Sequence, residues 1–156
     1  MRRPCAPLSA VMSAATVADI ARYQANRAPD AIALSFEGRQ TTFGALDLAS
    51  NQVANGLIAT GIKAQRRVAI LDKNSDIFFE VLLGAAKTNA VLVPINSRLA
   101  APEIAFILND AEAEVLFVGE SFAVTLTALR DQLTTVKLVV VLACRVCRMA
   151  RRAVRC

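Results

Sequence analysis

Three of the four cysteines lie near the carboxyl end of the sequence, where Cys144 and Cys147 are separated by two residues. Zinc sites and redox-active cysteine pairs both use this spacing. A structural zinc site needs four ligands, however, and the only further thiols are Cys156 and the distant Cys5. A redox pair would open a helix directly after a strand, whereas this pair lies among arginines. We therefore assign no metal ligand and no redox function to these cysteines.

The sequence contains no histidine, which excludes acid–base catalysis by histidine, but carboxylates are available for such chemistry. Asp72 precedes a predicted helix on which Asp76 and Glu80 are four residues apart, so these two share one helix face. Such a pair could bind a cation or transfer protons. The alternative that we favour is a solvated helix face on which Asp76, in the first turn, complements the helix dipole. We therefore assign no catalytic residue.

Phosphate binding through backbone amides needs closely spaced glycines, but the six glycines here are scattered singly, without a GxGxxG or GxxxxGK pattern. Asn96, Ser97 and Arg98 directly follow the apolar run "AVLVPI", which has the composition of a buried strand. Polar residues just beyond the carboxyl end of a parallel strand lie where open α/β sheets bind ligands, so Asn96 and Arg98 could face a phosphate. From spacing alone we favour an ordinary turn at Asn96 and Ser97, with Arg98 in solvent.

The net charge of +5 arises from the end of the sequence. Residues 143–156 contain five arginines and no acidic residue, so the preceding part carries 13 basic and 13 acidic residues. An arginine-rich tail could bind nucleic acid or an anionic membrane surface, and we keep this as an alternative function. We expect no nucleic-acid partner, because the neutral body predicts no matching basic face.

The cysteine distribution also bears on the cellular compartment. No cysteine lies between residues 5 and 144, so no disulfide framework can tie the core together, which indicates a reducing, cytoplasmic location. No run approaches the ~20 apolar residues that cross a bilayer, so we expect no transmembrane segment and at most a peripheral membrane contact. Prolines interrupt the opening "MRRPCAPLSAVMSAA", which is not a typical secretory signal. We expect residues 1–15 to be a disordered N-terminal extension.

Periodicity and turn signals divide residues 16–142 into alternating helices and strands. Thr16 is placed to cap a first helix, Glu37 and Gly38 to form the turn of a hairpin, and Ser75 to cap a deeply packed helix. The runs "RVAIL", "AVLVPI", "EVLFV" and "VKLVVVL" predict buried strands, and the intervening helices are "SDIFFEVLLGAAKTN", "PEIAFILND" and "FAVTLTALRDQL". This order predicts an α/β fold, with a mostly parallel sheet and helices on both faces.

Two ordered segments, "TTFGALDLASNQVANGLIATGIKAQRRVAIL" and "NSDIFFEVLLGAAKTNAVLVPINSRLAAPEIAFILNDAEAEVLFV", resemble the N-terminal portion of acyl-CoA synthetases, in particular long-chain fatty-acid–CoA ligases. These enzymes are AMP-binding, adenylate-forming ligases. The resemblance covers about residues 16–142 and implies a partial AMP-binding domain, an incomplete N-terminal part of the adenylate-forming ligase fold. It ends before residues 143–156, whose Arg, Ala, Cys and Val bias is expected of a GC-rich coding sequence read in a shifted frame.

The resemblance implies a ligase that activates a carboxylic (fatty) acid with ATP and Mg²⁺ to an acyl-adenylate and transfers the acyl group to coenzyme A. Family members carry a Gly-rich Ser/Thr loop and catalytic lysines that this sequence lacks. We therefore expect the chain to be inactive alone, and we assign it no bound ATP, Mg²⁺ or coenzyme A. Arg98 is the single candidate for cofactor binding, as a contact to a coenzyme A phosphate. An exposed sheet edge would favour self-association.

A non-catalytic binding module with the same fold is the remaining alternative. Such a module would dock onto a partner, for example a complete ligase, through an exposed face of its sheet or helices.

Overall fold

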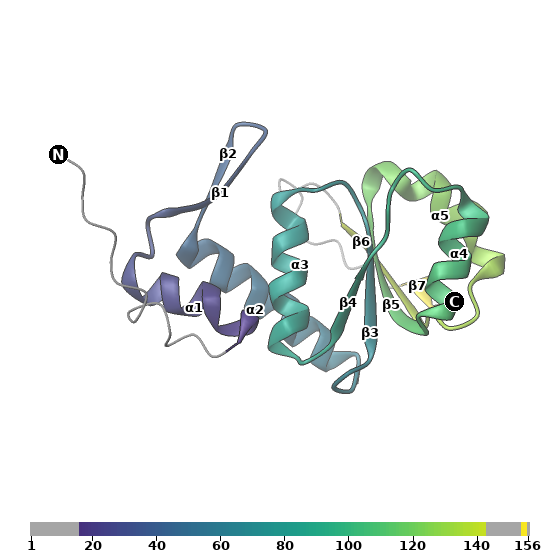
Figure 1. Cartoon of the computed structure of the whole chain (residues 1–156), viewed down its shortest axis with the longest axis horizontal. Coiled ribbons are helices and arrows are strands. Elements are labelled where there is room, and N and C mark those ends of the chain that lie inside the picture. Colours follow the sequence, from purple (N-terminus) through teal and green to yellow (C-terminus); the bar gives the residue numbers. More distant parts are fainter. Residues whose placement is uncertain (1–15, 143–153, 156) are drawn as a thin grey trace.

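The computed structural model describes residues 16–142 and 154–155, which form helices around a central sheet and a separate hairpin (Figure 1). The helices are α1 (Val17–Arg27), α2 (Phe43–Ala59), α3 (Asp76–Lys87), α4 (Ala101–Asp110) and α5 (Ala123–Leu129), with 3-10 turns η2 (Glu120–Phe122) and η3 (Arg130–Gln132). The strands are β1 (Ile32–Phe36), β2 (Arg39–Thr42), β3 (Arg67–Leu71), β4 (Val91–Pro94), β5 (Ala113–Gly119), β6 (Leu138–Leu142) and β7 (Val154–Arg155).

The central sheet has the strand order β4-β3-β5-β6-β7. β3 pairs in parallel with β4 on one side and with β5 on the other, and β6 continues the sheet in parallel beside β5. Only β7 runs antiparallel. The prediction of a mostly parallel α/β sheet is therefore confirmed, and the strand predicted from "RVAIL" coincides with β3.

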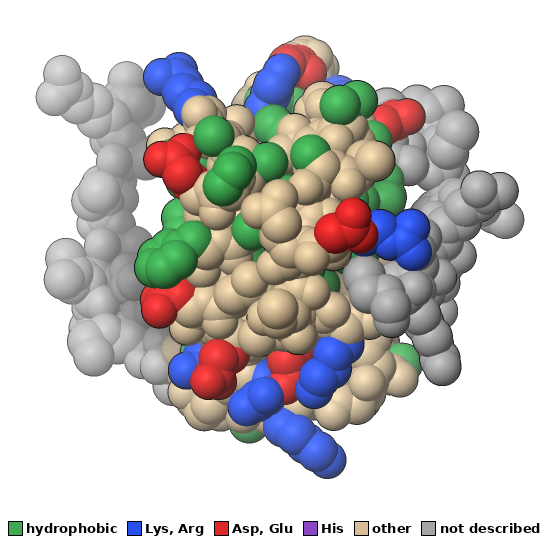
Figure 2. Space-filling model, turned by 90° about the vertical axis from the view of Figure 1, so that its right-hand side faces the viewer, with side chains coloured by type: hydrophobic (Ala, Val, Ile, Leu, Met, Phe, Trp, Pro, Cys, Tyr) green, Lys and Arg blue, Asp and Glu red, His purple; other side chains and the backbone are tan. Residues whose placement is uncertain are grey.

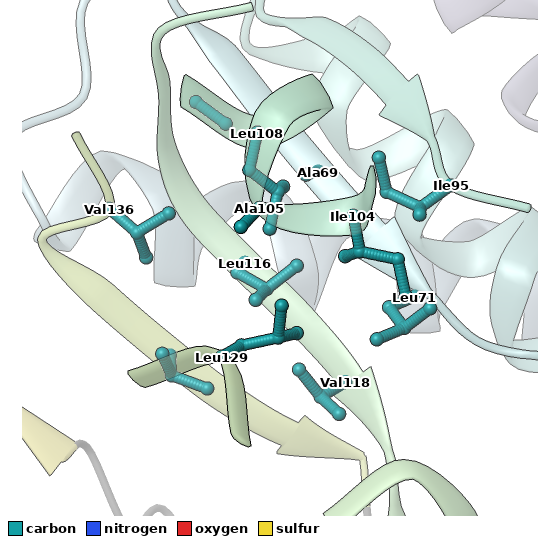
Figure 3. Packing of buried hydrophobic residues seen from close by; sticks show 12 residues of the cluster. Ala69, Leu71, Ile95, Ile104, Ala105, Leu108, Leu116, Val118, Leu129 and Val136 are labelled. Atoms are coloured by element: carbon teal, nitrogen blue, oxygen red, sulfur yellow. The ribbon is translucent and has the colours of Figure 1, made fainter. Parts of the chain in front are cut away.

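Both faces of the sheet are covered by helices, as the sequence predicts. Val68 and Ile70 of β3 point toward α2 and α3, where they pack with Leu57 and Val81. Side chains alternate along a strand, so the intervening Ala69 and Leu71 join the opposite cluster. That second cluster includes residues of α4 and α5, and Figure 3 shows its side chains packed between these helices and the sheet.

Local sequence signals account for the ends of several elements. The Asp19 carboxylate accepts hydrogen bonds from the backbone N–H and the hydroxyl of Thr16, so the predicted cap of α1 is confirmed. Ser75 accepts a hydrogen bond from the N–H of Phe78 and caps α3, again as predicted. The β1–β2 hairpin turns at Glu37 and Gly38, both with positive φ.

The last helical segment departs from the prediction. The sequence predicts one helix over "FAVTLTALRDQL", whereas the structure has the seven-residue α5 between η2 and η3. Only Leu129 of α5 is buried, so few contacts with the sheet are present to stabilise a longer α-helix here.

Close packing joins α2 to α3. Gly84 of α3 faces Val53 of α2, and a Cβ atom at Gly84 would lie 2.5 Å from Val53 Cγ1. At the end of α3, the half-buried Lys87 contacts α2: its Nζ donates to Asp47 Oδ1 at 2.6 Å and to Ser50 Oγ at 2.7 Å. The absence of a side chain at Gly84 therefore allows α2 and α3 to approach closely.

Charged side chains gather at the amino edge of the sheet, where the parallel strands begin. Arg66 Nε donates to Glu114 Oε1 at 2.6 Å, and Lys137 Nζ lies 3.3 Å from the same oxygen. Burial alone would raise the pKa of Glu114, but the hydrogen bonds and charges of Arg66 and Lys137 outweigh it and hold the pKa below its ordinary value. These ion pairs tie together the starts of β3, β5 and β6.

Among the helices of residues 16–142, none is both long and apolar enough to cross a bilayer.

The Gly84 packing leads to a test with a matched glycine. Gly84→Ala should destabilise the fold by about 1–3 kcal/mol, because the new methyl group overlaps Val53. Gly56→Ala in α2 should instead stabilise it by about 0.5–1 kcal/mol, since open space surrounds that position and alanine favours a helix. Urea unfolding midpoints of the two variants measure the difference, and a Gly84→Ala midpoint at or above that of the wild type would show that the helix contact is looser than described.

Candidate functional site

Three loops leave the carboxyl edge of the parallel sheet. One follows β3 at Asp72, the second follows β4 at Ile95, and the third follows β5 at Glu120. β3 lies between β4 and β5, so the three loops share one edge (Figure 1). The chain passes from β3 outward to β4 and then back across β3 to β5, which makes the boundary between β3 and β5 the topological switch point. Open α/β sheets bind ligands at this place.

The loop after β4 contains Asn96, Ser97 and Arg98. The side-chain oxygen of Asn96 accepts a hydrogen bond from the N–H of Arg98 at 3.0 Å, and the Asn96 carbonyl accepts one from Leu99. This is the turn that the sequence favours. Arg98 is exposed, and within residues 16–142 no ion pair engages it. Its guanidinium is therefore available to an anion at the carboxyl edge.

The loop after β3 carries a contact that the sequence did not predict. The Asp72 carboxylate lies so close to Gly119 at the end of β5 that a Cβ atom there would overlap Asp72 Oδ1. The same oxygen accepts a hydrogen bond from the N–H of Lys73 at 2.8 Å. Asp72 and Gly119 each follow or end a predicted strand, but only the pairing of β3 with β5 brings them together.

The Asp72 carboxylate is only partly solvated. Burial raises the pKa of Asp72 above its usual value, and hydrogen bonds from the Lys73 N–H and the Ser75 hydroxyl, together with the Lys73 charge, offset this only in part. The switch point therefore holds a carboxyl group that resists ionisation, beside exposed Lys73.

The prediction of a solvated face for Asp76 and Glu80 is wrong, because both residues are buried. Arg39 of the β1–β2 hairpin covers Asp76, with Arg39 Nη2 3.0 Å from Asp76 Oδ1, and its guanidinium also lies over the Phe36 ring. The expected position of Asp76 in the first turn of α3 is confirmed. Asp76 thus fastens the hairpin to α3, and both carboxylates are shielded from solvent.

Within residues 16–142, no group of three or more His, Cys, Asp or Glu side chains is arranged to hold a metal ion. The predicted Cys144 and Cys147 pair lies outside the described residues.

Comparison with known proteins decides the family. The sequence profile of the AMP-binding enzymes matches residues 21–152, which is most of the chain. This chain belongs to the AMP-binding enzyme family. The family predicted from the ordered segments of the sequence is therefore confirmed.

Individual members of the AMP-binding family show similar relationships. The fatty acid–[acyl-carrier-protein] ligase ScoC of Streptomyces coeruleorubidus is 39% identical over 107 residues, which is 69% of this chain and 21% of ScoC. The long-chain-fatty-acid–CoA ligase FadD13 of Mycobacterium tuberculosis is 44% identical over 91 residues, or 58% of this chain and 18% of FadD13. The chain thus spans about a fifth of the length of these curated relatives.

Solved structures confirm the incomplete adenylate-forming ligase fold. The inhibitor-bound N-terminal domain of FACL13 from Mycobacterium tuberculosis matches with a TM-score of 0.75 and 34% identity. The match covers 81% of this chain but 33% of that domain. About two thirds of the solved domain therefore lies beyond the part that this AMP-binding chain resembles.

The switch-point carboxyl group predicts a pH-dependent stability. Because its pKa is raised, Asp72 binds a proton more tightly in the folded state than in the unfolded state. Its stabilising contribution to folding is therefore fully present below the ordinary pKa of 3.8 and is lost as the pH rises through the folded-state pKa. Asp72→Asn should therefore raise the urea midpoint at pH 7, and this gain should vanish below about pH 3.8. Asp30→Asn, at an exposed loop position, serves as the control. A gain that persists in acid would contradict the assignment.

Proposed function

We propose that this chain is the front portion of an ATP-dependent acid–thiol ligase that acts on a carboxylic acid of the fatty-acid class. The observation that carries the proposal is its similarity to two fatty-acid ligases, at 39% and 44% identity. These two relatives differ in the acceptor, which is an acyl-carrier protein for ScoC and coenzyme A for FadD13. We favour coenzyme A, because the higher identity is to the CoA ligase.

The proposed reaction has two steps. A carboxylate oxygen attacks the α-phosphorus of Mg²⁺-bound ATP and releases pyrophosphate, which leaves an acyl-adenylate. The thiol of coenzyme A then attacks the acyl carbon and releases AMP, with the thiol proton passing to solvent. Both steps concentrate negative charge on phosphate oxygens, so clustered backbone amides and lysines are needed to stabilise the transition states. The sequence holds no such cluster, and we infer that the chain is inactive by itself.

Arg98 is the residue that we propose for cofactor binding. It is exposed at the carboxyl edge of the sheet, and the Asn96 turn fixes its backbone. A guanidinium in this position can bind a phosphate of coenzyme A through paired hydrogen bonds. Neighbouring Lys73 in the loop after β3 would add positive charge at the same edge.

Two further properties are proposed with this function. β4 ends the sheet, and its outer edge is unpaired within the described residues, so we propose that the isolated chain self-associates there. Light scattering would show a mass that rises with concentration, and a constant monomer mass would disprove self-association.

The placement of all cysteines outside residues 6–143 supports a reducing, cytoplasmic location.

ATP–pyrophosphate exchange tests the proposed incompleteness. The purified chain with Mg²⁺, ATP and a panel of fatty acids should exchange labelled pyrophosphate at the rate of the protein-free control. FadD13 under the same conditions is the positive control. Exchange well above background by this chain alone would show that the phosphate chemistry needs no further segment.

The Arg98 proposal is tested in a chimera in which residues 16–142 replace the matching segment of FadD13. Arg98→Ala should raise the KM for coenzyme A by about tenfold, the loss of roughly 1.4 kcal/mol of binding. Pyrophosphate exchange should not change, because the first step proceeds without coenzyme A. Arg130→Ala, at another exposed arginine, should alter neither quantity. An unchanged KM in Arg98→Ala would remove this residue from the site.

A further inference from the structure

The hydrogen bonds between β3 and β4 determine which backbone groups face outward at this end of the sheet. The N–H groups of Val91 and Ile95 donate to carbonyl groups on the β3 side. Alternate residues of a strand direct their backbone groups to opposite sides, so Val93 also faces β3, whereas Leu92 and Pro94 face outward. Because proline has no N–H, Leu92 holds the only outward N–H of β4.

This pattern of donors suits a second copy of β4. In an antiparallel pair with Leu92 opposite Leu92 of the other copy, the two residues exchange both of their N–H···O bonds. Pro94 then lies opposite Ala90 of the other copy, whose N–H already donates to the carbonyl of Ala85 in its own chain. The contact therefore leaves no N–H of either β4 unpaired, whereas a longer added strand would find no donor at Pro94.

The side of α3 that flanks this edge is apolar. Gly84 faces α2, so Leu82 and Ala86, two residues before and after it, point to the opposite side of the helix. Phe79 lies one turn before Leu82 on the same side and is 41% exposed. We call these three residues the α3 stripe. Because α2 packs over β3 and β5, the α3 stripe lies toward the outer edge of β4.

Charged residues are missing from both parts of this surface. The charged residues of α3 are Asp76, Glu80 and Lys87; the first two are buried and the third contacts α2. β4 has no charged residue. Exposed edge strands usually carry charges that prevent association. The outer edge of β4 and the α3 stripe thus form one uncharged surface beside an unpaired strand.

The face formed by α4 and α5 provides a contrast with greater exposure of an apolar group. Phe106 of α4 is 69% exposed. Glu103 and Asp110 flank Phe106 along α4, and Figure 2 shows acidic side chains beside the hydrophobic ones on this face. Single apolar residues among charges are normal on a protein surface. Exposure alone therefore does not distinguish the two surfaces, but charge does.

The opposite end of the sheet is already paired in part. β7 covers β6 at Leu138 and Val139. A head-to-tail contact between β4 of one copy and β6 of the next would have to displace β7, and it would add copies without limit. A contact between two β4 strands displaces nothing and closes after two copies.

We propose that this chain forms a closed dimer in which the β4 strands of two copies pair antiparallel about a two-fold axis at Leu92. The axis is perpendicular to the sheet, so both α3 helices lie on the same face and the two α3 stripes face each other. On the other face, Val91, which is 41% exposed in one chain, lies opposite Val93 of the other copy. The inference rests on the self-association proposed above and specifies its geometry.

Sedimentation equilibrium of the full chain tests the closed dimer. The wild type should fit a monomer–dimer equilibrium. Phe79→Lys places like charges across the axis and should raise the dissociation constant of the dimer at least tenfold, whereas Phe106→Lys, at another exposed helical phenylalanine, should leave it unchanged. Lysine favours a helix, and circular dichroism with urea unfolding verifies that both variants fold. Species larger than a dimer, or a dimer that Phe79→Lys leaves intact, would overturn the geometry, and a constant monomer mass would overturn self-association itself.

Disulfide formation tests the register. In a chain whose four cysteines are replaced by serine, Val91→Cys combined with Val93→Cys should give an oxidised dimer with two disulfides, because opposite residues of an antiparallel pair lie within bonding distance. Each single variant should stay unlinked, since position 91 lies opposite position 93 and not opposite itself. A dimer without these disulfides, or linkage of a single variant, would contradict the register. Dimer formation requires no catalysis, so the outcome of the exchange assay would leave this result unaffected.

Discussion

Burial of β3 on both faces is the constraint on which the other elements depend. Val68, Ala69, Ile70 and Leu71 are essentially inaccessible to solvent, and β4 and β5 pair with both edges of the strand. A strand in this position exposes no backbone polar group and no side chain, so two neighbouring strands and two helical layers must form around it. The two clusters on the faces of the sheet are therefore parts of one cooperative structure.

The two edges of the parallel sheet, at the starts and at the ends of its strands, carry different kinds of polar group. At the amino edge, Arg66 and Lys137 neutralise the carboxylate of Glu114, so the charged groups there are paired with one another. At the carboxyl edge, the loops leave in different directions because the helices lie on opposite faces. This edge holds Asp72 over Gly119 and exposed Arg98, so the polar groups available to a ligand are concentrated there.

Much of this architecture can be predicted from the sequence, because the signals are local. The continuous apolar run "RVAIL" has no polar side for solvent, and Glu37 with Gly38 suits a tight hairpin turn. The resemblance to adenylate-forming ligases rests on the order of such segments. The short α5 was predicted too long because helical periodicity does not report how little of the helix contacts the sheet.

The errors at the site come from contacts between distant residues. Asp76 and Glu80 have the spacing of a solvated helix face, but Arg39, 37 positions before Asp76, folds over and buries the first of them. The hydrogen bonds of Lys87 with α2 and the contact of Asp72 with Gly119 likewise depend on packing between elements. Periodicity within one element cannot show which residue of another element will meet it.

Native-state hydrogen exchange measures the central role of β3 most directly. If both layers form around this strand as one unit, the amides of β3 and β5 should exchange most slowly, with equal opening free energies that match global unfolding. The β1–β2 hairpin lies outside the sheet and is held by the Arg39–Asp76 ion pair and a small apolar cluster, so it should exchange faster. Exchange of the β3 amides at the rate of the hairpin, or well before those of β5, would contradict this account.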